Sequence, residues 1–136
     1  IKDWEEKQKE TKETKTITFS GAHRPLVYIS DGKINEIKGT RRPIGGRCKK
    51  IESNEFKDEI ISFHNQISLY MFTYCLPDQN NSEIKKFGKK RLLRTIKDSE
   101  DLSMREQKYR IITELNLFRK SSQQRDDITL IGIRIS

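Results

Sequence analysis

The pattern of the sequence predicts an α+β fold in which antiparallel strands precede two C-terminal helices and one final strand. Short segments rich in β-branched and aromatic residues follow one another between residues 16 and 72. After them come two segments with helical spacing of apolar residues, and then the apolar segment 128–135. Because a strand returns after the helical pair, we expect the helices to pack on the sheet.

The first strands are predicted to form an antiparallel meander. Residues 16–20 alternate between polar and apolar side chains, and residues 26–29 are rich in β-forming types. Asp31 and Gly32 are a strong two-residue hairpin signal, so residues 34–37 are the expected return strand.

Two further strands are predicted in the middle of the chain. Residues 56–63 can form one of them. The mostly apolar run 67–72, bounded by turn residues, is typical of a buried central strand, and residues 76–88 are expected to be a loop.

Two helices are predicted next. The first covers residues 89–97, with Leu92, Leu93 and Ile96 facing inward. Ser103 and Glu106 have the spacing of a capping box, in which each side chain accepts a hydrogen bond from a free backbone N–H group at a helix start. The second helix is expected to bury one face made of Ile111, Ile112, Leu115 and Phe118.

The composition indicates about one domain with a small core. The chain has 136 residues, of which 32% are apolar and 35% are charged, whereas an ordinary domain is closer to half apolar. We therefore expect a marginal domain or a piece of a larger one. Residues 1–15 are polar and of low complexity and are predicted to be a lead-in, which leaves residues 16–136 as the folded part.

No membrane segment or metal-binding cysteine pair is predicted. The apolar runs are shorter than the roughly 18 residues that suggest a membrane span, and the chain does not open with a signal-peptide pattern. Cys48 and Cys75 lack the spacing of metal ligands. We expect a reducing, cytoplasmic setting, with Cys75 as a structural thiol or, alternatively, a nucleophile.

An acidic pair, Asp126 and Asp127, precedes the final strand. Carboxylate oxygens are the ligands that Mg²⁺ and Mn²⁺ prefer, and a bound water polarised by such an ion can become a nucleophile. The same pair could equally form a solvated turn in which Asp126 accepts backbone hydrogen bonds. The local pattern leaves both interpretations open.

The net charge of +8 permits binding to phosphate-rich partners. Arg41 and Arg42 are candidate phosphate contacts, and so is a basic cluster around the start of the first predicted helix. A solvated basic surface remains the alternative interpretation. Nucleic acid is not favoured, because aromatic residues that could stack on bases are not interleaved with the cations. The cluster consists of Lys85, Lys86, Lys89, Lys90, Arg91 and Arg94.

Six short segments, taken in order, resemble the motifs of one enzyme family. They are residues 19–26 (FSGAHRPL), 42–45 (RPIG), 69–73 (LYMFT), 77–80 (PDQN), 85–92 (KKFGKKRL) and 124–130 (QRDDITL). Their order and spacing resemble the C-terminal part of metal-dependent protein serine/threonine phosphatases of the type 2C superfamily (PPM type). The likeness is to the bacterial branch named after stage II sporulation protein E.

The resemblance implies a part of an α-β-β-α sandwich whose site, at one edge, binds two Mn²⁺ or Mg²⁺ ions. In such enzymes a metal-bound water attacks a phosphoserine or phosphothreonine, which is in keeping with two-metal hydrolysis. It also implies a phosphorylated signalling protein of the anti-sigma-factor antagonist type as partner, and an upstream sensor or receiver domain.

Two departures from the family pattern bear on activity. The N-terminal half, which carries a "G-D-x-x-G-H-G" element with a metal-bridging Asp, has no match in this chain. Tyr74 and Cys75 stand where the family has a metal-binding Asp and a turn Gly, and Asp126 matches the remaining metal-binding Asp. A phenol with a pKa near 10 does not replace a carboxylate on Mg²⁺. We therefore expect the chain to be inactive or impaired alone; a basic, non-catalytic module that binds a phosphoprotein or nucleic acid is the alternative.

Overall fold

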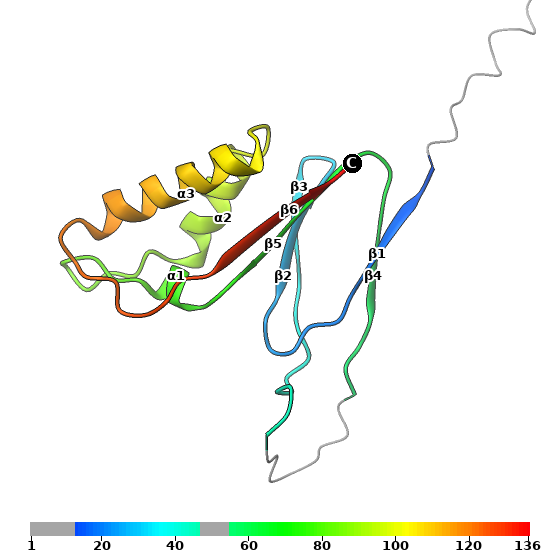
Figure 1. Cartoon of the computed structure of the whole chain (residues 1–136), viewed down its shortest axis with the longest axis horizontal. Helices are drawn as coiled ribbons and strands as arrows, with labels where there is room; N and C mark the ends of the chain where they lie inside the picture. Colours follow the sequence, from blue (N-terminus) through cyan, green and yellow to red (C-terminus); the bar gives the residue numbers. More distant parts are fainter. Residues whose placement is uncertain (1–12, 47–54) are drawn as a thin grey trace, which may run out of the picture.

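The structure is a computed structural model that describes residues 13–46 and 55–136. Most of the predicted lead-in, and Cys48, lie outside the described residues. The predicted succession of strands, two helices and a last strand is confirmed (Figure 1). No helix among the described residues is long and apolar enough to cross a membrane.

A four-stranded antiparallel sheet forms the centre of the molecule, in the order β3-β2-β5-β6. The hairpin between β2 and β3 turns at Asp31 and Gly32, both with positive φ, as expected for a tight two-residue turn. The final strand, β6, pairs with β5 and is an edge strand of this sheet. The strands are β2 Leu26–Ser30, β3 Lys33–Ile37, β5 Ile67–Phe72 and β6 Leu130–Ile135.

A separate antiparallel ribbon lies beside this sheet and consists of β1 Lys15–Phe19 and β4 Glu59–Phe63. The strand expected over residues 56–63 therefore starts three residues later, since Phe56 lies in the preceding segment. Ile61 and Phe63 of the ribbon pack against Ile67 and Leu69 of β5. The ribbon therefore covers part of one face of the sheet.

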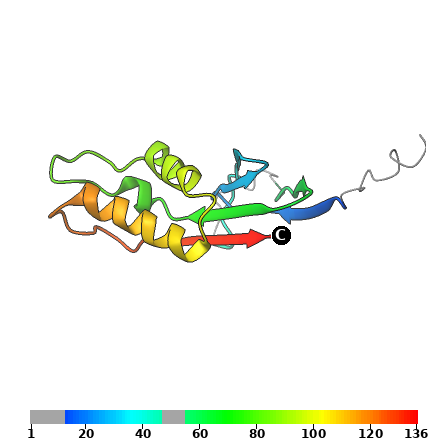
Figure 2. The ribbon, with the colours of Figure 1, turned by 90° about the horizontal axis from the view of Figure 1, so that it is seen from above.

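Strand β5 is buried on both faces, as the sequence predicts for a central strand. Alternate residues point to opposite sides of a sheet. Ile67 and Leu69 accordingly join the cluster on the ribbon side, whereas Tyr70 and Phe72 join the cluster beneath the helices. The molecule thus has a helical layer, a sheet and a ribbon, which is the expected arrangement of helices packed on a sheet (Figure 2).

Two helices, α2 Lys89–Asp98 and α3 Met104–Arg119, form the helical layer. Leu92 and Ile96 of α2 are fully buried, and the predicted capping box of Ser103 and Glu106 is confirmed. Ile111 is buried, but the prediction that Ile112 faces inward is wrong, because 43% of its surface is exposed. One residue along a helix rotates the side chain by about 100°, which carries Ile112 off the buried face.

A one-turn helix, α1 Cys75–Asp78, replaces the start of the loop expected over residues 76–88. The Asp78 N–H donates to the Tyr74 carbonyl at 3.0 Å. Pro77 is compatible with this turn because the first N–H groups of a helix need no acceptor within it. The turn brings the chain back under the helical layer, where Leu76 is buried.

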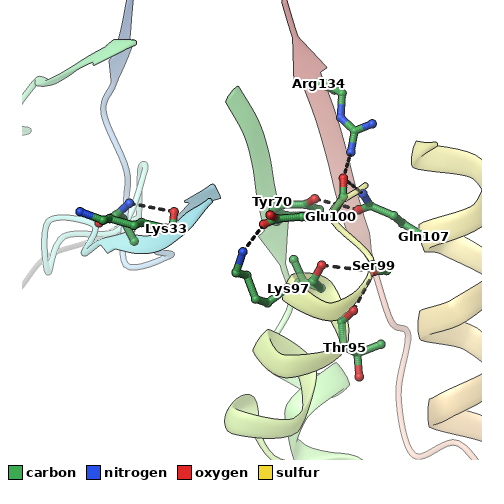
Figure 3. A network of polar contacts seen from close by, with 10 residues as sticks. Lys33, Tyr70, Thr95, Lys97, Ser99, Glu100, Gln107 and Arg134 are labelled. Carbon is green, nitrogen blue, oxygen red and sulfur yellow. Dashed lines mark hydrogen bonds and ion pairs between the residues drawn. The ribbon is translucent and has the colours of Figure 1, made fainter. Parts of the chain in front are cut away.

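A buried polar network joins the α2–α3 connection to the sheet (Figure 3). The Tyr70 hydroxyl donates to Gln107 Oε1 at 2.7 Å, and Gln107 Nε2 donates to the Leu102 carbonyl at 3.1 Å. Arg134 of β6 donates to the Glu100 carbonyl. Burial raises the pKa of Tyr70, so its phenol stays protonated as a donor.

Candidate functional site

The candidate site lies where β5 ends. Thr73 continues the pairing beyond the strand: its N–H donates to the Thr129 carbonyl at 3.0 Å, and its hydroxyl accepts from the Thr129 N–H at 3.1 Å. These bonds align the end of β5 with the segment that enters β6. As a result the structure brings Cys75 and Asp126, far apart in sequence, together at the end of the sheet where β5 stops and β6 begins.

Cys75 and Asp126 are in direct contact. The thiol lies 3.4 Å from Asp126 Oδ2, to which it donates. The other carboxylate oxygen of Asp126 accepts the N–H of Asp127 at 2.8 Å. Both oxygens of Asp126 are therefore engaged by groups of the protein, and the carboxylate of Asp127 is exposed to solvent.

The thiol of Cys75 is held in its neutral form. Desolvation raises the pKa of Cys75, and the hydrogen bond to the negatively charged Asp126 raises it further. The thiolate is the form of cysteine that binds metals and attacks electrophiles. Cys75 is therefore a weak nucleophile and a weak metal ligand in this arrangement.

The ring of Tyr74 contacts the guanidinium of Arg24, and the side chain offers no carboxylate to a metal ion. The guanidinium carbon of Arg24 lies 3.8 Å from the centroid of the Tyr74 ring, in cation–π contact. Strand pairing explains why Arg24 contacts Tyr74. Val27 lies opposite Tyr70 in the antiparallel β2–β5 pair, so the residues before β2 lie beside those after β5. Tyr74 itself is half exposed.

Gln79 is a positioning residue that sequence analysis did not single out. It is 2% exposed, and its Nε2 donates to the Asn80 and Gln123 carbonyls at 2.9 and 3.0 Å. Its Oε1 accepts the N–H of Arg125 at 3.4 Å. Gln79 thereby fastens the segment before Asp126 to the turn after β5. The sequence signal that could have indicated this role is the position of Gln79 within the PDQN motif, residues 77–80.

Arg41 and Arg42 lie on a loop that adjoins Arg24. The His23 N–H donates to the Thr40 carbonyl at 2.8 Å, which holds this loop against the corner before β2. Arg42 lies over the Phe56 ring, at 5.5 Å from the centroid. Arg41 lines a hollow with Lys57 and Glu59 at the foot of the ribbon. Three arginines are thus carried by two touching loops.

The described residues do not fit a Mg²⁺ or Mn²⁺ site. They contain no group of three or more His, Cys, Asp or Glu side chains placed to share an ion. Hard cations need several oxygen ligands, whereas Asp126 has a neutral thiol as neighbour and Tyr74 has a guanidinium. No metal-dependent step can therefore be derived from these side chains.

Comparison with solved structures identifies the class of fold. The chain resembles the SiaA-PP2C domain of Pseudomonas aeruginosa, with 26% identity and a TM-score of 0.76 over 89% of this chain and 47% of that one. It also resembles the structure of the PP2C phosphatase domain and a fragment of the regulatory domain of SpoIIE from Bacillus subtilis. That match has 19% identity and a TM-score of 0.57 over 88% of this chain and 34% of that one. The fold is that of a PP2C-type phosphatase domain.

The family follows from the sequence. Residues 10–136 match the profile of stage II sporulation protein E (SpoIIE), and the chain belongs to this family. It spans about half the length of the SiaA-PP2C domain. No curated protein matches the chain significantly.

Proposed function

We propose that this chain is a phosphatase-type domain segment that binds a phosphorylated signalling protein and does not by itself hydrolyse the phosphate. The observation that carries the proposal is the arrangement after β5, where Arg24 stacks on Tyr74 and the Cys75 thiol donates to Asp126. At the position where the resemblance implies a metal carboxylate, this chain has a neutral ring beneath a cation.

The proposed phosphate contacts are Arg24, Arg41 and Arg42. A guanidinium can donate two parallel hydrogen bonds to a phosphate, and its always-positive charge strengthens them. Arg24 uses the face of its guanidinium on Tyr74, and a face contact leaves the N–H edges as donors. The adjoining loop adds the other two guanidiniums.

The proposed partner is a phosphorylated bacterial regulator of the anti-sigma-factor antagonist type, met in the cytoplasm. The family supports this class of partner, and the arginines supply the chemistry for its phosphate. An upstream sensor or receiver domain in the whole protein would control the encounter. Asp126 and Asp127 remain predicted metal contacts in a whole protein whose other parts supply further carboxylates beside them.

The activity half of the test uses 4-nitrophenyl phosphate with Mn²⁺ or Mg²⁺. We expect no metal-dependent release of nitrophenol by this chain, because its own donors do not make a site for these ions. Turnover that depends on the metal and disappears in Asp126→Asn would contradict the proposal. Circular dichroism of both proteins checks that they are folded.

The binding half of the test uses O-phosphoserine, with serine as control, followed by NMR shifts of backbone amides. We expect shifts at residues 21–24 and 39–42 with phosphoserine only. Arg24→Gln should weaken binding about tenfold, as expected for the loss of one charge-assisted contact. Arg105→Gln, at an exposed arginine on α3, is the matched control. Equal weakening by the two variants would refute specific binding.

A salt titration distinguishes binding of a phosphorylated protein from the alternative, binding of nucleic acid. Binding to the phosphate backbone falls steeply as salt rises, because each contact releases counterions. Tight binding of random duplex DNA with that steep dependence, and no response to phosphoserine, would replace the proposed function with nucleic-acid binding.

A further inference from the structure

A groove of about 670 Å³ runs between α2 and α3. The side chains that pack on the sheet from these helices, such as Leu92, Ile96 and Ile111, belong to the core. The charged residues that line the groove are exposed, except Glu114, which is half-buried, so the groove opens on the outer side of the helical layer. They are Lys90, Arg91, Arg94 and Arg110, with Asp98 and Glu114.

The basic cluster noted in the sequence divides into two groups. Three of its lysines are neutralised locally: Lys85 pairs with Glu83, Lys86 with Asp78, and Lys89 with Glu36. The other members line the groove. Within the part of the chain that the structure describes, the side chains of Lys90, Arg94 and Arg110 have no ion pair or hydrogen bond. The groove therefore brings together the members of the basic cluster that have no ion pair among the described residues, with Arg110 beside them.

Arg91 is held in place at one end of the groove. Its guanidinium carbon lies 4.6 Å from the centroid of Phe118 and 5.7 Å from that of Phe87. The two rings meet edge to face at 5.4 Å. Stacking uses the face of the guanidinium, so its edge is pre-oriented to donate two hydrogen bonds to a carboxylate. Ordering the side chain in advance lowers the entropy lost on binding.

The mixed lining favours a peptide over a nucleic acid. Asp98 and Glu114 would repel a continuous phosphate backbone, and Phe87 is too buried to stack on a base. Leu117 lines the same groove and is 68% exposed, so the ligand should also carry an apolar group. Four basic against two acidic side chains leave an excess of positive charge that acidic side chains would complement.

We propose that the α2–α3 groove binds an acidic segment of a partner protein in extended form. Its carboxylates lie on Arg91, Arg94 and Arg110, and an apolar side chain lies on Leu117. The 10 residues of α2 give a length of about 15 Å at 1.5 Å per residue, which an extended peptide of roughly five residues spans. This surface is on the helical layer, and the inference does not rest on the proposed phosphoserine contacts.

The test titrates the folded chain with the peptide Glu-Glu-Leu-Glu-Glu and follows backbone amide shifts by NMR. We expect shifts along α2 and α3, and a loss of affinity of about tenfold or more in Arg91→Gln/Arg94→Gln. Lys85→Gln/Lys86→Gln removes the same charge outside the groove and should retain most of the affinity. The peptide Lys-Lys-Leu-Lys-Lys should not bind there.

Three results would overturn the proposal. They are no response to the acidic peptide, equal weakening by the two double variants, or displacement of the peptide by duplex DNA with a steep salt dependence. Arg91 packs on Phe118, so its replacement could unfold α3. Arg110→Gln removes no such contact, and its affinity for the acidic peptide therefore tests the groove independently. Phosphoserine binding should be unchanged in every groove variant, which separates this proposal from the proposed function.

Discussion

At the scale of single residues, Tyr70 shows how one polar group ties two layers together. Its ring lies in the core beneath the helices, and its hydroxyl donates to Gln107 of α3, which is itself 2% exposed. A buried acceptor that loses its donor pays the cost of desolvation without a hydrogen bond. The pair therefore contributes to the docking of α3 on the sheet.

Replacing this tyrosine tests the contribution directly. Tyr70→Phe keeps the ring but removes the donor to Gln107, and we expect the free energy of unfolding to fall by about 1–3 kcal/mol. Urea denaturation followed by circular dichroism measures the change. Tyr109→Phe, at an exposed position on α3, is the control and should stay within about 0.5 kcal/mol of the parent. A neutral Tyr70→Phe would mean that the hydrogen bond adds nothing to stability.

At the scale of elements, α3 depends on a reciprocal cap. The Ser103 hydroxyl accepts from the Glu106 N–H, and the Glu106 carboxylate accepts from the Ser103 N–H at 2.9 Å. The Ser103 hydroxyl and then its backbone N–H lower the pKa of Glu106, because both hydrogen-bond the ionised form. A helix start is thus defined by two side chains three residues apart.

Loss of the cap should weaken the helix measurably. Ser103→Ala leaves the Glu106 N–H without its side-chain acceptor, and we expect about 1 kcal/mol less stability. The pKa of Glu106, followed by NMR, should also return toward its ordinary value. Ser82→Ala, in an exposed loop, removes the same hydroxyl without affecting a cap. An unchanged Glu106 titration in Ser103→Ala would show that the cap does not form in solution.

At the scale of the whole molecule, one side of the sheet is incompletely covered. Ile131 and Ile133 stand opposite Met71 and Leu69 and so share the face on which the ribbon packs. They are nonetheless 47% and 43% exposed, and β6 has no strand on its outer edge among the described residues. Exposed apolar strands at a sheet edge favour association with other chains.

We therefore expect the isolated chain to self-associate or to be poorly soluble. Light scattering coupled to size-exclusion chromatography should give a mass above that of the monomer. Ile131→Thr/Ile133→Thr should shift the population toward monomer while preserving β propensity. Ile84→Thr, at an exposed loop position, should have no effect. A compact monomer at every concentration would contradict this expectation.

Much of the local structure could be predicted from residue patterns. Asp31 and Gly32 can adopt positive φ, Ser103 and Glu106 can close a cap, and residues 67–72 are too apolar for an exposed strand. These features depend on neighbours within a few positions, which a single sequence displays. Ile112 was misplaced because periodicity alone did not define which edge of the apolar stripe faces the core.

The residue patterns alone were sufficient to predict the α+β class, the order of the elements and the resemblance to the phosphatase family, because these follow from local patterns and short motifs. The three-dimensional fold was needed to show that Arg24 covers Tyr74, that Cys75 donates to Asp126, and that Gln79 holds their segments together. Such contacts join residues about 50 positions apart, as between Cys75 and Asp126. Strand register and the packing of layers set them, and neither is written in the residues nearby.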